Sequence, residues 1–223
     1  MNNFLLRAAG LTATIFAGLS VVMAPLNALA RMRTTDGLSD FENPLASWWA
    51  RPAMRAASPL VEWGYPDKVY ETYGKFYVFA LLAVLACAIA VRSRRGTAGM
   101  GLAERWGWRI SLPSYALLAT SLFITYWVAN LDVVFLLVTL PTMLLNTIGE
   151  LLLGIGLIRS KFRPRLTGWL LALGFPLSQG LIAISTQALG MWPTMFAWGL
   201  AGWSLWRSSP RQSVQVPRAT LAT

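Results

Sequence analysis

The chain has 223 residues with a net charge of +10, and it is 56% hydrophobic but only 13% charged, whereas a soluble domain carries about 25% charged residues. This composition excludes an ordinary soluble domain and predicts an all-α polytopic membrane protein, because the apolar runs are continuous and do not alternate as barrel strands do. The chain has no histidine and one cysteine, which excludes histidine-ligated haem or zinc, histidine-activated nucleophiles and an intramolecular disulfide.

The first apolar segment, Phe4 to Ala30, has two interpretations. Arg7 near its start and the sequence Ala28-Leu29-Ala30 at its end are typical of a cleaved signal peptide. Its length favours a retained transmembrane helix, and small residues recur on one face at every fourth position, which would let another helix approach closely. That face comprises Ala9, Ala13, Ala17, Gly10, Thr14 and Gly18. We favour a retained first helix over residues 1–30, with the signal peptide as the alternative.

Residues 31–75 form the one long hydrophilic stretch, with six basic and six acidic residues and many aromatic ones. Prolines divide it into short pieces, at positions 44, 52, 59 and 66. Because aromatic residues beside membrane spans usually mark the headgroup level, we expect short helices on the outer membrane surface. The alternative is a lid or a docking surface for a protein partner, since long ordered loops are often functional. Pro66 is expected in the first turn of the next helix.

Residues 76–206 are predicted to form the rest of the helix bundle, and residues 207–223 a disordered tail. The predicted spans are Phe76–Val91, Ile110–Ala129, Val134–Ile158, Leu166–Thr186 and Pro193–Trp206. Pro113 is expected in the first turn of its span, residues 130–132 and 187–192 as turns, and Gly174 with Pro176 as a kink. With the first segment these spans make six helices, or five if that segment is cleaved.

Charge predicts the orientation of the bundle. The loops after the second and fourth spans, together with the tail, hold twelve basic residues and one acidic residue, Glu104. By the positive-inside rule these loops and both termini are cytoplasmic, and residues 31–75 lie outside an inner membrane. We interpret the basic clusters as orientation signals and expect no nucleic-acid partner; binding of anionic lipids or phosphorylated partners is the alternative. Most tryptophans lie near span ends as interfacial anchors, but Trp198 lies inside the last span.

The candidate site is a polar stripe within Val134–Ile158. Thr139, Thr142, Asn146 and Glu150 are spaced by three, four and four residues, which places them on one helix face. If this span and the next pack as an antiparallel hairpin, Gln179 matches the depth of Asn146 and Gly174 matches that of Glu150. We therefore expect Asn146 and Gln179 to be able to hydrogen-bond and Glu150 to face Gly174.

The spans contain no Lys, Arg or His that would neutralise Glu150. A buried carboxyl without a cation tends to be protonated, and acids inside the membrane are usually functional or paired. Three interpretations stay open: a proton or cation site, a neutral hydrogen-bonded structural acid, or an acid that meets a basic group of another subunit. Since Asp132 lies at the membrane boundary, no second intramembrane carboxylate exists for a catalytic pair. We predict no catalytic residue, cofactor or metal site.

Three segments of the C-terminal half carry a resemblance: residues 154–159 (GIGLIR), residues 163–171 (RPRLTGWLL) and residues 197–207. They resemble uncharacterised small multi-pass membrane proteins of actinobacteria and their relatives, a resemblance that implies no activity. We expect a protein that binds or moves a small solute, lipid or proton near Glu150. The alternative is a structural or accessory subunit whose protein partners contact the outer loop and first helix; a membrane-embedded lipid or isoprenoid enzyme comes third.

Overall fold

The protein is described by a computed structural model that covers residues 2–96, 99–128 and 132–207. Every regular element in these ranges is a helix, which confirms the all-α class. Five long or central helices are α1 (Asn3–Arg31), α5 (Pro66–Arg95), α6 (Leu102–Phe123), α8 (Leu140–Arg159) and α12 (Trp192–Arg207). The shorter elements are η1 (Thr35–Gly37), α2 (Leu38–Glu42), α3 (Pro44–Ala56), α4 (Ser58–Val61), η2 (Ile124–Val128), α7 (Asp132–Val134), η3 (Phe135–Thr139), α9 (Arg165–Ala172), α10 (Gly174–Ala183) and α11 (Gln187–Gly190).

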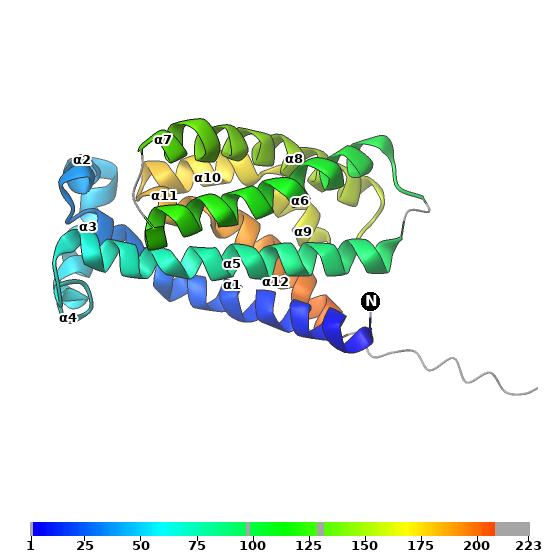
Figure 1. Ribbon diagram of the computed structural model, residues 1–223, viewed down its shortest axis with the longest axis horizontal. Helices are drawn as coiled ribbons and strands as arrows, with labels where there is room; N and C mark the ends of the chain where they lie inside the picture. The colour runs from blue at the N-terminus through cyan, green and yellow to red at the C-terminus, as the bar shows by residue number, and fades with distance from the viewer. Residues whose placement is uncertain (1, 97–98, 129–131, 208–223) are drawn as a thin grey trace, which may run out of the picture.

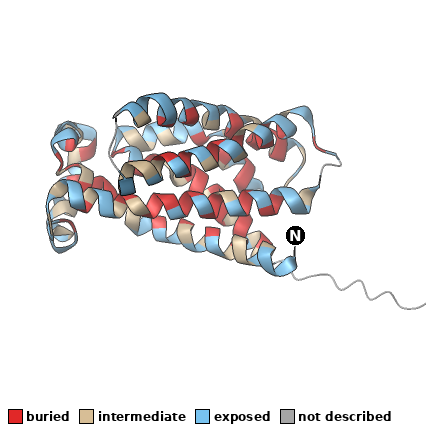
Figure 2. Cartoon of the chain, viewed as in Figure 1, coloured by how far each residue is buried: buried red, intermediate tan, exposed pale blue. Residues whose placement is uncertain are grey.

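The helices pack lengthwise into a bundle (Figure 1). α6 lies along α8, α1 lies along both α12 and α5, and α9 contacts α8 and α12. Buried residues concentrate on α5, whereas α1 and α8 each turn one side outward (Figure 2). Those outward sides carry large apolar side chains such as Leu19, Val22, Leu144 and Ile148, as expected for helices in contact with lipid.

Four helical segments of the described chain are long and apolar enough to cross a membrane: Asn3–Arg31, Pro66–Arg95, Leu102–Val128 and Phe135–Arg159. A fifth is added if α9 and α10, which are bent by 63° at their junction, form one broken span. α12 has 16 residues, fewer than the roughly 20 that a span usually needs. The helix predicted as the sixth span is therefore present but is not among these candidates.

Two local predictions differ from the structure. Pro113 lies inside α6, not in its first turn, because the helix already begins at Leu102; the preceding residues are helical since Glu104 and Trp108 are buried in the bundle. Residues 187–192 are mostly helical, as α11, rather than a plain turn. The kink is confirmed at Leu173, between α9 and α10. The turn predicted at 130–132 and the tail after Arg207 fall largely outside the described residues.

The small-residue face of α1 is in close contact with α12. A Cβ atom added to Gly10 would lie 2.5 Å from the carbonyl oxygen of Gly202, and one added to Gly199 would clash with Ala17. Thr14 Oγ1 also donates a hydrogen bond of 3.0 Å to the carbonyl oxygen of Gly199. A helix thus does approach Gly10, Thr14 and Ala17 of this face closely, as predicted, and that helix is α12 of the same chain.

The short helices α2 to α4 cover one end of the bundle, as predicted for the hydrophilic stretch (Figure 1, left). They share a small core formed by Leu29, Met32, Ala46, Ala50 and Val61. Trp49 Nε1 donates to the carbonyl oxygen of Ile184 at 2.6 Å, and Tyr73 Oη donates to that of Leu60 at 2.6 Å. Pro66 occupies the first turn of α5, also as predicted. These contacts attach the short helices to the bundle end.

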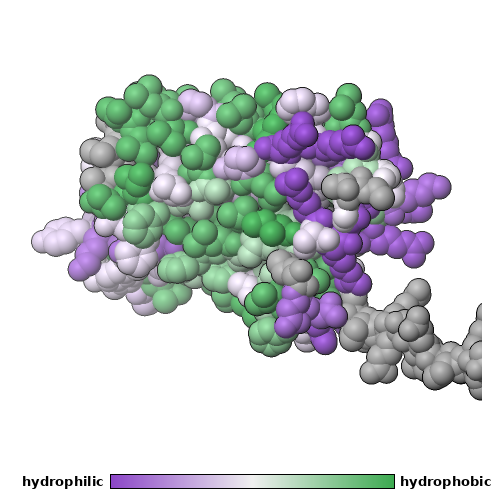
Figure 3. Space-filling model, turned by 45° about the vertical axis from the view of Figure 1, so that its right-hand side comes forward, coloured by the Kyte–Doolittle hydropathy of each residue, from purple (hydrophilic) through white to green (hydrophobic). Residues whose placement is uncertain are grey.

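Hydrophilic side chains gather at the opposite end, and apolar side chains cover much of the remaining visible surface (Figure 3). This basic end contains the C-termini of α5 and α8 and the N-termini of α6 and α9 (Figure 1). The two ends are hereafter called the short-helix end and the basic end.

Candidate functional site

Glu150 is buried between three helices, with 5% of its surface exposed. Tyr115 of α6 donates a hydrogen bond of 2.8 Å from its hydroxyl to Glu150 Oε1. Thr194 of α12 donates from Oγ1 to both carboxyl oxygens, at 2.9 and 3.0 Å. The centre is therefore assembled from residues that lie 35 and 44 positions away from Glu150 in the sequence.

Trp198 orients the Tyr115 hydroxyl. Its Nε1 donates to Tyr115 Oη at 2.9 Å, and the two rings meet edge to face with their centroids 6.2 Å apart. Both side chains are fully buried. Because the indole N–H can only donate, the Tyr115 oxygen accepts from Trp198 and its own proton is directed to Glu150.

No described Lys or Arg forms an ion pair with Glu150. Both groups that hold its carboxyl are neutral hydroxyls, each able to donate or to accept. The site can therefore keep the carboxyl hydrogen-bonded with or without its proton, because Tyr115 donates to Oε1 in both states and the Thr194 hydroxyl can accept from a protonated Oε2.

Glycines bring the neighbouring helices up to the carboxyl. A Cβ atom added to Gly149 would lie 2.7 Å from Ser111 Oγ, so α6 and α8 touch next to Glu150. A Cβ atom added to Gly174 would lie 3.2 Å from Glu150 Oε2. The expectation that Glu150 faces Gly174 is confirmed, and the break between α9 and α10 lies directly beside the carboxyl.

The other predicted site residues behave differently. Asn146 lies one turn before Glu150 on the same helix face, and its Oδ1 atom is buried without a hydrogen-bond partner. Gln179 is exposed, and the predicted hydrogen bond to Asn146 is not formed. The prediction assumed a straight fifth span, whereas the 63° bend at Leu173 changes the direction of the chain before Gln179.

Thr139 and Thr142 are buried on the same stripe as Glu150 but do not touch its carboxyl. The Thr139 hydroxyl hydrogen-bonds with that of Ser121 on α6. The polar stripe of η3 and α8 thus hydrogen-bonds to α6 at both of its ends, through Thr139 and Glu150, and we call the line of polar residues between these helices the α6–α8 seam. It comprises Ser111, Tyr115, Ser121, Thr139, Thr142, Asn146 and Glu150.

Sequence reasoning missed Tyr115 and Thr194 as site residues. A signal existed on the third span, where Ser111, Ser114, Tyr115 and Ser121 recur at intervals close to helical periodicity. Trp198, noted as the tryptophan inside the last span, also belongs to the centre. Thr194 gives no such signal, because only the packing of α12 on α1 and α9 brings it to Glu150.

A second buried acid, Glu104, was not predicted as such. Its side chain has no exposed surface, and it forms a two-point ion pair with Arg95, whose Nη2 lies 3.0 Å from Oε2. Trp108 Nε1 adds a hydrogen bond of 3.5 Å. The pair joins the end of α5 to the start of α6, and Gly156 of α8 packs directly on Glu104.

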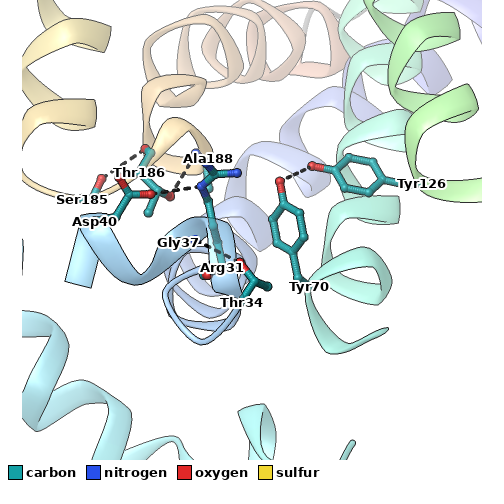
Figure 4. Close-up of polar contacts among 9 residues, drawn as sticks. All are labelled: Arg31, Thr34, Gly37, Asp40, Tyr70, Tyr126, Ser185, Thr186 and Ala188. Atoms are coloured by element: carbon teal, nitrogen blue, oxygen red, sulfur yellow. Dashed lines mark hydrogen bonds and ion pairs between the residues drawn. The ribbon is translucent and has the colours of Figure 1, made fainter. Parts of the chain in front are cut away.

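A third polar cluster lies at the short-helix end (Figure 4). Arg31 pairs with Asp40 at 3.0 Å, and its guanidinium lies 5.9 Å from the ring centre of Tyr70. Tyr70 Oη is 3.1 Å from Tyr126 Oη. These contacts connect α1, α2, α5 and η2, and both members of the ion pair are partly exposed. We assign this cluster to the attachment of the short helices.

Within the described residues, no group of three or more His, Cys, Asp and Glu side chains is arranged to hold a metal ion. A comparison of the sequence with protein-family models, curated proteins and solved structures gives no match. The function is therefore argued from the geometry around Glu150.

Proposed function

We propose that this is an integral membrane protein that binds a proton at Glu150 and uses this site to move protons, or a small solute together with protons, across the membrane. The observation that carries the proposal is a buried carboxyl on an apolar candidate span that is hydrogen-bonded by the hydroxyls of Tyr115 and Thr194 and paired with no described cation. Ionisable residues inside membrane bundles commonly mark ion or proton paths.

Protonation is the change that such a site accommodates most easily. Burying an unpaired charge is costly, so the carboxyl favours its neutral form unless a cation arrives. Tyr115 and Thr194 donate to Glu150 when it is ionised, and a hydroxyl can equally accept from a protonated carboxyl. Neither state leaves the carboxyl without hydrogen bonds, so a proton can be gained and lost without dismantling the centre.

The broken helix next to Glu150 supports a transport role. Transporters commonly place ion sites where a membrane helix is interrupted, since the helix ends supply partial charges there. Gly174 is both the first residue of α10 and the neighbour of Glu150 Oε2. The N-terminal end of a helix favours nearby negative charge, which lowers the cost of the ionised state during a transport cycle.

For the orientation, we propose an inner membrane with the basic end in the cytoplasm and the short helices outside. Hydrophilic side chains gather at one end (Figure 3), where Arg92, Arg94 and Arg95 end α5 and Arg159 ends α8, and this supports the arrangement. With α9–α10 as one broken span and α12 as a short one, the chain crosses six times and both termini are cytoplasmic. Ala197, Trp198 and Ala201 of α12 are buried, so this helix is mostly surrounded by protein.

The test is proton flux in reconstituted liposomes that contain a pH-sensitive dye, with a potassium diffusion potential as the driving force. We expect wild-type protein to admit protons faster than empty liposomes and Glu150→Gln to abolish the difference. Thr147→Val is the matched control, because Thr147 lies on the same helix and its hydroxyl bonds only to its own helix, at Met143. Equal flux for wild type and Glu150→Gln, or no flux with wild type under any added solute gradient, would refute the proposal.

An accessory-subunit role is the second candidate, and one observation favours it. Trp48 and Tyr65 at the short-helix end are 72% and 84% exposed, and exposed aromatic side chains are typical anchors of protein interfaces. Extraction in a mild detergent followed by mass spectrometry tests this role. A protein that co-purifies in a fixed ratio and is lost on replacing Trp48 and Tyr65 by Ser would support it, whereas purification of the chain alone would count against it.

A further inference from the structure

Two buried polar atoms beside the Glu150 centre have no hydrogen-bond partner: Ser111 Oγ and Asn146 Oδ1. Buried polar groups are nearly always satisfied, and an orphaned one usually indicates a site for water or an ion. Both atoms lie on the α6–α8 seam. These two unpartnered atoms therefore indicate sites for water on either side of the Glu150 carboxyl.

The two atoms lie on opposite sides of the hydrogen-bonded pair Tyr115–Glu150. α8 runs toward the basic end, so Asn146 lies one turn before Glu150, about 6 Å nearer the short-helix end. α6 runs the opposite way, so Ser111 lies one turn before Tyr115, nearer the basic end. The order along the bundle is therefore Asn146, Glu150 with Tyr115, then Ser111.

The seam stays polar from Asn146 toward the short-helix end. Thr142 and Thr139 are buried, and Thr139 hydrogen-bonds to Ser121 across the two helices. These residues extend about 17 Å from Glu150 along α8, at 1.5 Å per residue. α10 bends away at Leu173 over this half of the bundle, so the fifth span does not pack on α8 here as closely as α9 does.

The opposite half is apolar and tightly packed. Leu153 and Trp108 are almost completely buried, and a Cβ atom added to Gly107 would clash with the backbone of Leu153. A Cβ atom added to Gly154 would lie 2.7 Å from the carbonyl oxygen of Gly168 on α9. Only beyond this layer does the polar pair Arg95–Glu104 begin. Helices in direct contact leave no room for water.

We propose that the α6–α8 seam is a hydrated proton path that connects Glu150 with the short-helix end through Asn146 and stops at Ser111, closed toward the basic end by Trp108 and Leu153. This inference rests on the proposed function and adds its direction: protons exchange with Glu150 from the short-helix side in this conformation. Asn146 and Ser111 bind the water that carries the proton on either side of the Tyr115–Glu150 pair.

Cysteine accessibility tests the path without measuring transport. Cys87 is the only cysteine of the chain and is buried, so Cys87→Ala provides the background. Single cysteines are introduced at Asn146 and Thr142 in the seam and at Leu153 in the closed layer. Ala56→Cys and Leu102→Cys mark the two ends, since both positions are exposed. A charged methanethiosulfonate, which does not cross membranes, is added to either side of sealed vesicles.

We expect Asn146→Cys and Thr142→Cys to react only from the side on which Ala56→Cys reacts, at least about ten-fold faster than Leu153→Cys, because the hydrated thiolate is the reactive form. Seam cysteines that react no faster than Leu153→Cys, or that react from the side of Leu102→Cys, would overturn the path. Thr142→Cys keeps the test valid if Asn146→Cys does not fold, as judged by size-exclusion elution. A flux that depends on Glu150 together with unreactive seam cysteines would reject the path and leave the proposed function intact.

A separate variant, Ser111→Ala, tests where the path ends inside the bundle. Ser111→Ala removes an unpartnered hydroxyl, whereas Ser114→Ala removes a buried hydroxyl that bonds only to its own helix, at Ile110. In the liposome assay we expect Ser111→Ala to lower proton flux at least about five-fold relative to Ser114→Ala, since it removes a water ligand next to Tyr115. Equal flux for the two variants would exclude Ser111 from the path.

Discussion

The ion pair between Arg95 and Glu104 leads to an asymmetric prediction. The Glu104 side chain is completely buried, whereas 21% of the Arg95 side chain is exposed. Arg95→Ala leaves a buried carboxyl without its cation, and breaking a buried pair in this way costs about 3–5 kcal/mol. Glu104→Ala leaves a guanidinium that can turn toward water, and we expect a smaller loss of about 1–3 kcal/mol.

The double variant Arg95→Met with Glu104→Leu gives the sharpest comparison. Replacing both members of a buried pair by apolar side chains of similar volume is often neutral or stabilising, so the double variant should be more stable than Arg95→Ala. Arg94→Ala is the control, because Arg94 is exposed and surface substitutions usually stay within about 0.5 kcal/mol. The free energy of unfolding is measured by titration with SDS in mixed micelles, followed by far-UV circular dichroism. If Arg95→Ala matched Arg94→Ala, or if the double variant were the least stable, the assignment of a buried pair would be wrong.

Three further predictions use the close contacts of the bundle; the first two are measured with the same unfolding assay and the third with the liposome flux assay. Gly202→Val should destabilise the protein by about 2–3 kcal/mol, because the side chain would enter the backbone of α1; Gly18→Val, with open space around its Cβ position, is its control. Tyr115→Phe should cost about 1–3 kcal/mol, since it leaves Glu150 Oε1 and Trp198 Nε1 each without one hydrogen bond; a change under about 0.5 kcal/mol would contradict the observed network. Gly174→Val should displace the Glu150 carboxyl, whose Oε2 lies 3.2 Å from the new Cβ position, and so reduce proton flux, while Gly180→Val, which meets nothing within 4 Å, should retain it.

Much of the fold could be predicted, because apolar runs and prolines determine where helices form and end from neighbouring residues alone. The helices, the break beside Gly174 and most of the short pieces of residues 31–75 follow from nearby sequence. Pro52, predicted to divide this stretch, instead lies inside α3. The number of spans was harder to predict. The sequence predicts a sixth span at α12, but this helix has only 16 residues and is shorter than a usual membrane span. Likewise, the small-residue face of α1 predicted a close contact with another helix but did not identify that helix, which is α12.

The candidate site divides in the same way. Glu150 and its neighbour Gly174 could be predicted, because counting residues along α8 and α9 gives their depth correctly before the bend. Gln179 lies after the bend at Leu173, and there the same counting fails. Thr194 reaches Glu150 because α12 packs on α1 and α9, and no local pattern encodes this contact between segments far apart in the chain.

The two buried acids of this bundle argue together for the role of Glu150. Glu104 and Glu150 both lie where α6 and α8 meet, and the chain supplies Glu104 with a cation, Arg95. It supplies Glu150 with a tyrosine, a threonine and an unpartnered amide oxygen on the adjacent turn. If Glu150 only held helices together, an acid paired with a cation, as Glu104 is, or a neutral glutamine at this position would do so equally well. An arrangement that satisfies the carboxyl in both protonation states is what a proton-exchanging group requires, and Glu150→Gln separates these roles: it should leave the stability nearly unchanged and remove the flux.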